Sequence, residues 1–402
     1  MRMKRYLYFM LLLFLPITSG CWDRVEVNDL AFVMATSLDL TEDGKLVETI
    51  QTANLTSEGQ NGQGGAGGGQ KIITMTVTGK NNIDLDQKEQ EKMSRKMYIA
   101  HRSVLIIGER LAKHGIRDIL DWYGRNPESR LRTYILIARG TDGRDVLKVA
   151  YPLERNPAVA MKEMEKLGSK TSVTLREFMM VSANEGINPV AGYIEPVTES
   201  SMGLKQQEEE QKEPDNLMLK GTAVFKNFKL VGYLDSEETG GLIALTGKFK
   251  RGSITAENIP GVPGNVGLNI TKEKLHIHPY LRENKIKFNI ALKAEGDIFE
   301  NNTNLDLSQP QNMKIVQDAL CKSLEQRMRR TLSAAQNKFH VDIFGFGQAI
   351  NRSNPKLWKS LKEQWDEKFS EAEFSIAIDL TVRRSGMSGA PLQIKEDEVK
   401  KE

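Results

Sequence analysis

The first twenty residues constrain this chain most, because they indicate that it is exported before it folds. They contain three basic residues and then an apolar run of 12 residues, 6–17. Thr18, Ser19 and Gly20 follow the run. A basic start, a short apolar core and a small-residue exit are typical of a secretory signal peptide. A helix of that length rises only ~18 Å, which is too short for a hydrocarbon core of ~30 Å. We therefore expect residues 1–20 to be a signal peptide that is removed.

Cys21 indicates which kind of leader this is. Ser19-Gly20-Cys21 resembles the lipobox of bacterial lipoproteins, in which a diacylglycerol is attached to the cysteine and the chain is cut before it. The sequence departs from that box at Thr18, where leucine is usual. The alternative is an ordinary secretory leader that is cut nearby, with Cys21 unmodified. We expect lipid attachment at Cys21, and two acyl chains are enough for a stable anchor.

Charge and cysteine content narrow the class of protein. The formal net charge is +3, and the leader carries three positive charges and no negative ones. The remaining chain is therefore close to neutral, which gives no support to nucleic-acid binding. Cys21 and Cys321 are the two cysteines. If Cys21 carries lipid, Cys321 has no disulfide partner in the chain, and the hydrophobic core alone must hold the fold.

A charged segment divides the chain into two expected parts. Residues 199–216 include a run rich in Glu, Gln and Lys and contain no aromatic residue, so we expect a solvated linker. Before it, residues 21–198 form the expected N-terminal domain, which could consist of two subdomains. After it, residues 217–386 form the expected C-terminal domain. Residues 387–402 read as a charged tail.

The hydrophobic patterns of the two parts predict an α+β fold. In the first part, expected strands alternate with helices such as residues 108–124, which favours a mixed α/β layer. In the second part, residues 285–295 alternate apolar and polar side chains, as in a half-buried antiparallel strand. Residues 308–338 are the longest expected helix. We therefore expect a C-terminal antiparallel sheet with helices packed on one face.

Few residues suggest chemistry. His276 and His278 would share one face of a strand, but no third ligand is evident nearby, so we expect a surface pair and no metal. The glycine-rich segment 58–70 lacks the Gly-Lys-Ser/Thr ending of a phosphate-binding loop, and we expect a surface loop. Neither Gly-x-Ser-x-Gly nor His-Glu-x-x-His occurs. We expect no cofactor and no catalytic activity.

Two blocks of sequence resemble a known family. The first begins at Cys21 and continues through Trp22, Asp23 and Glu26 to the apolar residues 30–33. The second covers residues 221–245, and Asn354-Pro355 and Trp358 follow it in the later helices. Both are similar to the Ger(x)C spore-germination lipoproteins, the C subunits of nutrient germinant receptors. The resemblance extends over nearly the whole chain after the leader.

The resemblance implies a function and a location. Proteins of this family lie on the outer face of the spore inner membrane, held by the lipid on the residue that corresponds to Cys21. There they assemble with two multi-pass membrane subunits, of A and B type, into a receptor that triggers germination. No catalysis is known for the C subunit. Trp22, Asp23 and Glu26 would then be candidates for docking onto a membrane subunit, although they could equally be plain linker residues.

A second class of function stays open. A lipid-anchored solute-binding protein of a transporter would have the same leader and no catalytic motif. Such a protein has two similar α/β lobes around a cleft. The two halves of this sequence differ in pattern, which favours the receptor subunit. An exported hydrolase is disfavoured by the missing motifs.

Overall fold

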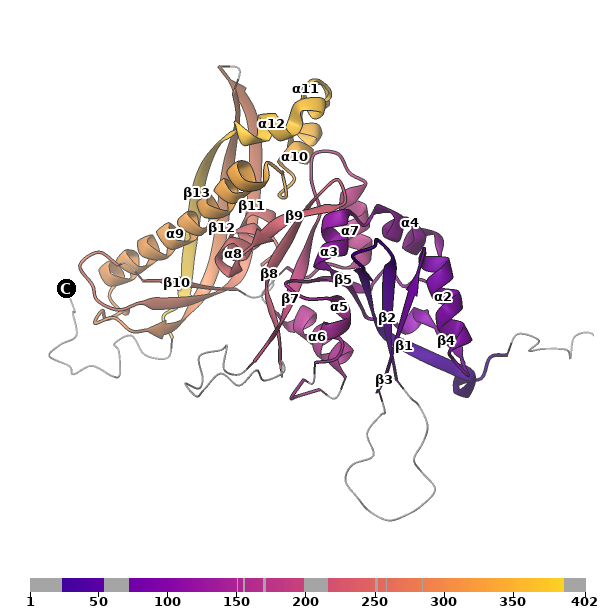
Figure 1. Cartoon of the computed structure of the whole chain (residues 1–402). Helices are drawn as coiled ribbons and strands as arrows, with labels where there is room; N and C mark the ends of the chain where they lie inside the picture. The colour runs from indigo at the N-terminus through magenta and orange to yellow at the C-terminus, as the bar shows by residue number, and fades with distance from the viewer. Residues whose placement is uncertain are drawn as a thin grey trace, which may run out of the picture.

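The computed structural model describes residues 24–53, 72–149, 151–154, 156–168, 171–198, 216–249, 252–257, 259–283 and 285–386. The expected leader, Cys21, Trp22 and Asp23 lie outside the described residues. So do the glycine-rich segment 58–70, residues 199–215 of the expected linker and the tail 387–402. The described residues form two sheets with helices packed against them (Figure 1). Among the described helices, none combines the length and the apolar character needed to cross a membrane.

The first sheet has nine strands in the order β3-β2-β1-β5-β6-β7-β8-β9, with β4 beside β1. β1, β5, β6 and β7 pair in parallel, as βαβ units do, and the outer pairs on both sides are antiparallel. The strands are β1 (Leu30–Leu40), β2 (Leu46–Ala53), β3 (Ile72–Gly79), β4 (Lys96–Tyr98), β5 (Val104–Gly108), β6 (Tyr134–Ala138), β7 (Val190–Val197), β8 (Asn216–Lys226) and β9 (Lys229–Leu234).

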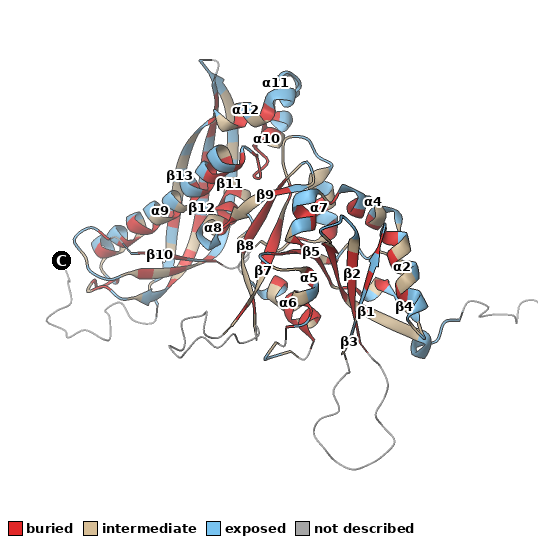
Figure 2. Cartoon of the chain, in the orientation of Figure 1, coloured by how far each residue is buried: buried red, intermediate tan, exposed pale blue. Residues whose placement is uncertain are grey.

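Helices cover both faces of this sheet. Leu105 and Ile107 of β5 pack into one core with α2, α3, α4 and α7, whereas Val104 and Ile106 pack into another with α5 and α6. β5 is therefore buried along its whole length (Figure 2). These helices are α2 (Asn82–Glu91), α3 (Glu109–His114), α4 (Arg117–Arg125), α5 (Gly143–Val146), α6 (Pro157–Leu167) and α7 (Leu175–Ser182).

Local signals set several helix ends. Thr174 and Glu177 form a capping box at the start of α7. The single helix expected at residues 108–124 is wrong, because Gly115 ends α3 with a φ of +129° and the chain restarts as α4. Glycine tolerates this positive φ, whereas a residue with a side chain would be strained there.

The second sheet has four strands, in the order β10-β11-β12-β13. They are β10 (Gly252–Ala256), β11 (Val266–Arg282), β12 (Lys285–Asn301) and β13 (Glu373–Arg384). The expected α+β class is confirmed, but a wholly antiparallel sheet is wrong at one edge. β13 pairs in parallel with β12, because the long helical connection between them returns the chain to the starting end of β12.

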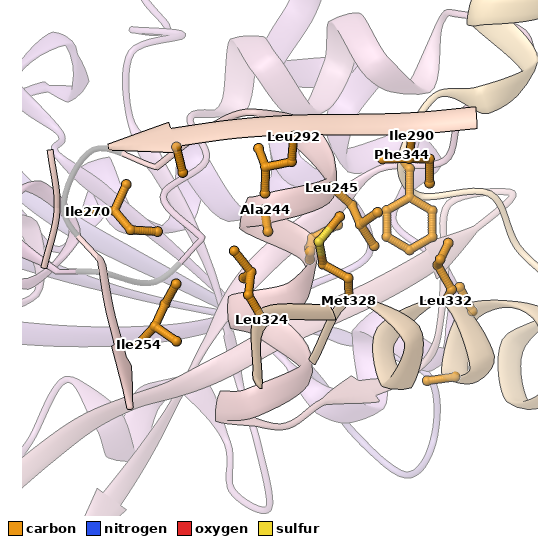
Figure 3. Packing of buried hydrophobic residues seen from close by; sticks show 14 of the residues in the cluster. Ala244, Leu245, Ile254, Ile270, Ile290, Leu292, Leu324, Met328, Leu332 and Phe344 are labelled. Atoms are coloured by element: carbon orange, nitrogen blue, oxygen red, sulfur yellow. The ribbon is translucent and has the colours of Figure 1, made fainter. Parts of the chain in front are cut away.

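Five helices and a π-helical segment pack with this sheet. They are α8 (Ser236–Thr246), α9 (Pro310–Ser333) continued by Ala334–Phe339, α10 (Phe346–Ser353), α11 (Pro355–Leu361) and α12 (Trp365–Ser370). Leu324, Met328 and Leu332 of α9 point into a core that also contains Leu245 of α8 and Ile290 of β12 (Figure 3). Alternate residues of β12 are buried, so helices cover one face of the sheet as expected.

β8 joins the two regions. Ala223 and Phe225 lie in the core of the first sheet, while Val224 between them lies in the core of the second region, together with Leu234 of β9. The first sheet thus takes its last two strands from residues that follow the expected linker. The two cores meet at β8, and the division of the chain at residues 199–216 stays a prediction.

Candidate functional site

A cleft lies between the two regions and is the candidate functional site. Its volume is about 510 Å³. One wall is the loop between α7 and β7, residues 182–189, with the turn at Asn227 and Phe228. The other wall is Trp358 of α11 with residues 362–367. Both walls are rich in polar groups.

Glu185 and Lys362 connect the walls across the cleft. The Glu185 carboxylate accepts a hydrogen bond from Trp358 Nε1 at 3.2 Å and from Lys362 Nζ at 3.1 Å. The Lys362 ammonium, followed by the Trp358 indole, lowers the pKa of Glu185. Glu185 is therefore a charged, positioned acceptor and not a proton donor at neutral pH.

The two walls also approach each other closely at a pair of glycines, Gly186 and Gly347. Gly186 has a φ of +75°, and a Cβ built on it would lie 2.7 Å from Cη2 of Trp358 and 2.8 Å from the carbonyl carbon of Gly347. A side chain at residue 186 would push the two regions apart. The close approach of these two backbones therefore requires glycine.

Asp342 holds the second wall in place from within. Its fully buried carboxylate accepts backbone N–H bonds from Phe344, Gly345 and Gly347 at 2.9 Å, and an indole bond from Trp365 at 3.2 Å. Burial raises the pKa of Asp342, and the backbone hydrogen bonds oppose that shift. The Asp342 carbonyl accepts the Asn188 N–H at 2.7 Å, which ties the wall to the first region.

The turn between β8 and β9 closes one end of the cleft. Asn227 and Phe228 have φ values of +51° and +65°, as in the two-residue hairpin turns that match strand twist. The turn joins β8 and β9 into an antiparallel hairpin. Lys226 Nζ lies 2.8 Å from the Asp366 carboxylate of the opposite wall, and the Arg117 guanidinium lies over the Phe228 ring.

Several polar side chains that line the cleft are engaged in hydrogen bonds and ion pairs. Its charged side chains, such as Glu185 and Lys362, already pair with each other, and Ser182 donates its hydroxyl to the Phe178 carbonyl. Among the described lining residues, none forms the nucleophile and base pair that covalent catalysis needs. The cleft can accommodate a small polar solute, or it can serve as a joint between the regions.

The sequence-predicted site residues lie elsewhere. Glu26 is exposed, forms an ion pair with Arg24 at 3.0 Å and does not line the cleft. Cys21, Trp22 and Asp23 are outside the described residues. The cleft itself was missed, because Glu185 and Lys362 are far apart in the sequence and only the packing of α11 on the first region brings them together.

Other expected site features can be placed as well. His276 and His278 are exposed on β11, as expected of a surface pair. Cys321 lies half-buried on α9, as expected of a small side chain at the edge of a core.

Comparison with known proteins identifies the family. A sequence model described as the spore germination protein N-terminal domain matches residues 23–196. A second, described as spore germination B3/GerAC like, C-terminal, matches residues 220–386. The chain belongs to the GerAC-like family of spore germination proteins. The family resemblance seen in the sequence is thereby confirmed.

Full-length relatives of this family support the assignment. The putative spore germination protein YfkR of Bacillus subtilis is 28% identical, over 96% of this chain and 98% of its own length. Spore germination protein KC of the same organism is 25% identical, over 98% and 99%. The crystal structure of the GerBC protein superposes with a TM-score of 0.53 at 18% identity, and covers 89% of this chain and 100% of its own. The two-region architecture is thus that of GerBC.

Proposed function

We propose that this protein is the lipid-anchored C subunit of a nutrient germinant receptor in the spore inner membrane. The observation that carries the proposal is the tandem match of both GerAC-like domains, in order, from residue 23 to residue 386. The N-terminal match begins two residues after Cys21, so the expected anchor directly precedes the folded body. The subunit has no catalytic role, and it acts by binding its partners and positioning them.

The start of the body fits a position close to a membrane or a membrane partner. Val25 and Val27 follow the anchor and are 49% and 60% exposed. Glu26 between them is exposed beside Arg24. Residues 24–27 thus form a short surface with apolar and charged groups, and Trp22 and Asp23 precede them in the sequence. We propose that the two multi-pass A-type and B-type subunits contact this surface on the outer face of the inner membrane.

Deletion of the gene tests the receptor function. Spores that lack it should fail to respond to the nutrients of one receptor, while germination by nutrient-independent agents stays normal. Complementation with the intact gene should restore the response. Normal germination with every nutrient, in a strain without related C subunits, would contradict the proposal.

Substitution of Cys21 tests the anchor. The Cys21→Ala chain should move from the membrane fraction to the soluble fraction, because the diacylglycerol supplies the stable attachment. Cys321→Ala is the matched control, since it removes the other cysteine and should leave the chain on the membrane. Full retention of the Cys21→Ala chain, in a strain without the A and B subunits, would exclude a lipid anchor.

One observation favours a second function, that of a solute-binding protein. The cleft of about 510 Å³ has the size and polarity for an amino acid or a small sugar. However, the regions on either side have different folds, unlike the paired lobes of such proteins. Calorimetry of the full chain with amino acids and sugars separates the two functions. Micromolar binding that Glu185→Ala abolishes would favour the second, and no binding would favour the receptor subunit.

A further inference from the structure

Three carboxylates converge between the first sheet and α2, away from the cleft. Glu48 lies on β2, and Asp86 and Glu89 lie one turn apart on α2, which packs beside it. One carboxylate oxygen from each residue lies within 4.8 Å of the other two. Glu48 and Glu89 are buried, and Asp86 is half-buried at the edge of the group.

Glu89 lacks the partners that a buried charge needs. The Glu89 side chain is fully buried, and neither of its oxygens has a hydrogen-bond partner in the described structure. Buried polar groups are almost always paired, so two orphaned oxygens on one carboxylate require an explanation. Because Glu89 lies among the other two carboxylates, its free oxygens point to a bound group that contacts all three.

Two positive groups act on these carboxylates, and neither forms an ion pair with them among the described residues. Lys92 is exposed and donates to the Thr76 carbonyl at 3.2 Å. Arg102 is buried and does not satisfy the carboxylates. Its Nη1 donates to the Thr36 hydroxyl at 3.1 Å and to the Tyr123 hydroxyl at 2.6 Å. Its Nη2 is buried without a partner, and no ion pair within 4.0 Å joins it to the three acids among the described residues. Three ionised carboxylates and one guanidinium would leave two negative charges uncompensated.

Uncompensated buried charge is strongly unfavourable. The site must therefore be neutralised either by protons or by a bound cation. Each carboxyl could bind a proton of its own, but protons would still leave the buried Glu89 oxygens without a partner, whereas one cation would contact all three carboxylates.

The spacing fits a hard divalent cation. Two oxygens on opposite sides of a Ca²⁺ ion at ~2.4 Å are about 4.8 Å apart, and Mg²⁺ requires slightly less. Ca²⁺, Mg²⁺ and Mn²⁺ all prefer carboxylate oxygen ligands. We propose that Glu48, Asp86 and Glu89 bind one such divalent cation, whose charge balances the cluster together with Arg102. Half-buried Asp86 provides the route of entry, and the ion ties α2 to β2.

Sequence reasoning missed this site and predicted no metal. The signal was weak, because Asp86 and Glu89 belong to a polar helix in which acidic residues are common, and Glu48 is distant in the sequence. The one local clue is an ionisable residue in the middle of a strand of mostly β-forming residues.

Direct binding to the full chain tests the proposal. The purified chain in detergent, freed of metal with a chelator, is titrated calorimetrically with CaCl₂, MgCl₂ and MnCl₂ separately. We expect one site per chain for at least one of the three, and a rise in the unfolding temperature on saturation. Absence of stoichiometric binding for all three at millimolar concentration would overturn the proposal.

Two variants locate the site. Glu89→Gln should weaken binding at least 30-fold, and Glu48→Gln together with Glu89→Gln should abolish it. Glu91→Gln on the same helix, where the side chain is exposed, is the matched control and should bind as the unmodified chain does. Both cluster variants remove buried repulsion, so they should fold and be at least as stable without metal. Unchanged affinity in the double variant would overturn the assignment to these residues.

Discussion

The two sheets of this protein differ in how many of their faces are buried. The first sheet lies between two layers of helices, and its central strand β5 has no exposed residue. The second sheet has helices on one face, and β12 alternates buried and exposed residues along most of its length. A strand with two buried faces tolerates a charge only where a specific partner satisfies it, whereas a strand with one open face tolerates it at every second position. Introducing a lysine should therefore change the free energy of unfolding by very different amounts in the two regions.

The largest expected effect is in the first sheet. Ile106→Lys on β5 places an ammonium where the side chain is fully buried between sheet and helices. We expect a loss of more than about 4 kcal/mol, enough to prevent folding, because the ammonium would be taken out of water and crowded into a packed apolar core. Expression in the soluble fraction and circular dichroism measure it. Ile106→Val is the control and should cost only about 1 kcal/mol.

The junction between the regions should be almost as sensitive. Asp342→Ala removes the acceptor of three backbone N–H groups and the Trp365 indole. Leaving these buried donors unpaired should cost about 3–5 kcal/mol in the free energy of unfolding, measured by urea denaturation. Asp342→Asn keeps one acceptor oxygen and should lose less. A loss below about 1 kcal/mol with Asp342→Ala would show that water replaces the carboxylate.

A buried acid in the first region should make its stability depend on pH. Asp39 accepts backbone bonds from Gly143 at 2.7 Å and Arg144 at 3.1 Å, yet burial outweighs them and raises its pKa from 3.8 to about 6. Between about pH 4 and pH 6 the folded chain then binds more protons than the unfolded chain, so this residue makes stability fall as pH rises. The fall should total up to about 3 kcal/mol.

Asp39→Asn should remove that contribution. Urea unfolding of both chains at pH 4, 5, 6 and 7 measures it, and the difference between the two curves isolates Asp39 from the other acids. The asparagine oxygen can still accept the Gly143 N–H, so the variant should fold. Parallel curves would mean that Asp39 has an ordinary pKa in the folded protein.

The smallest effect is expected on the open face of the second sheet. Ala291 on β12 is exposed, with His276 and Ala377 beside it on the neighbouring strands. Ala291→Lys should change the free energy of unfolding by less than about 0.5 kcal/mol. Thermal unfolding checks it. A loss above about 1.5 kcal/mol would mean that this face is covered, and would remove the contrast between the two sheets.

Much of this contrast could be predicted from the sequence. The unbroken apolar run around Ile106 indicates a strand that is buried on both faces. The alternation around Ile290 indicates a strand that is buried on one face. The caps at Thr174 and Asp235 indicate where their helices begin, because each capping box joins residues that are three apart in the sequence. The parallel edge strand β13 could not be predicted, since alternation reports which face is buried but not the direction of the neighbouring strand.

The candidate sites were harder to predict than the fold. Glu185 and Lys362 meet because Gly186 permits a close approach that no sequence pattern announces. The family motifs predict a site at Cys21 and residues near it, because those residues are consecutive in the chain. Contacts assembled from distant segments leave no such local pattern.

The place of β8 and β9 has a consequence for biosynthesis. A chain that emerges amino end first from a ribosome or a translocation channel presents β7 before its partner β8 exists. Until residue 226 has emerged, the backbone N–H and C=O groups along one edge of β7 are open to pairing with any other nascent strand. Completion of the first sheet thus depends on the later arrival of β8 and β9. A chain whose synthesis stops within residues 199–215 should therefore be a substrate for chaperones and proteases.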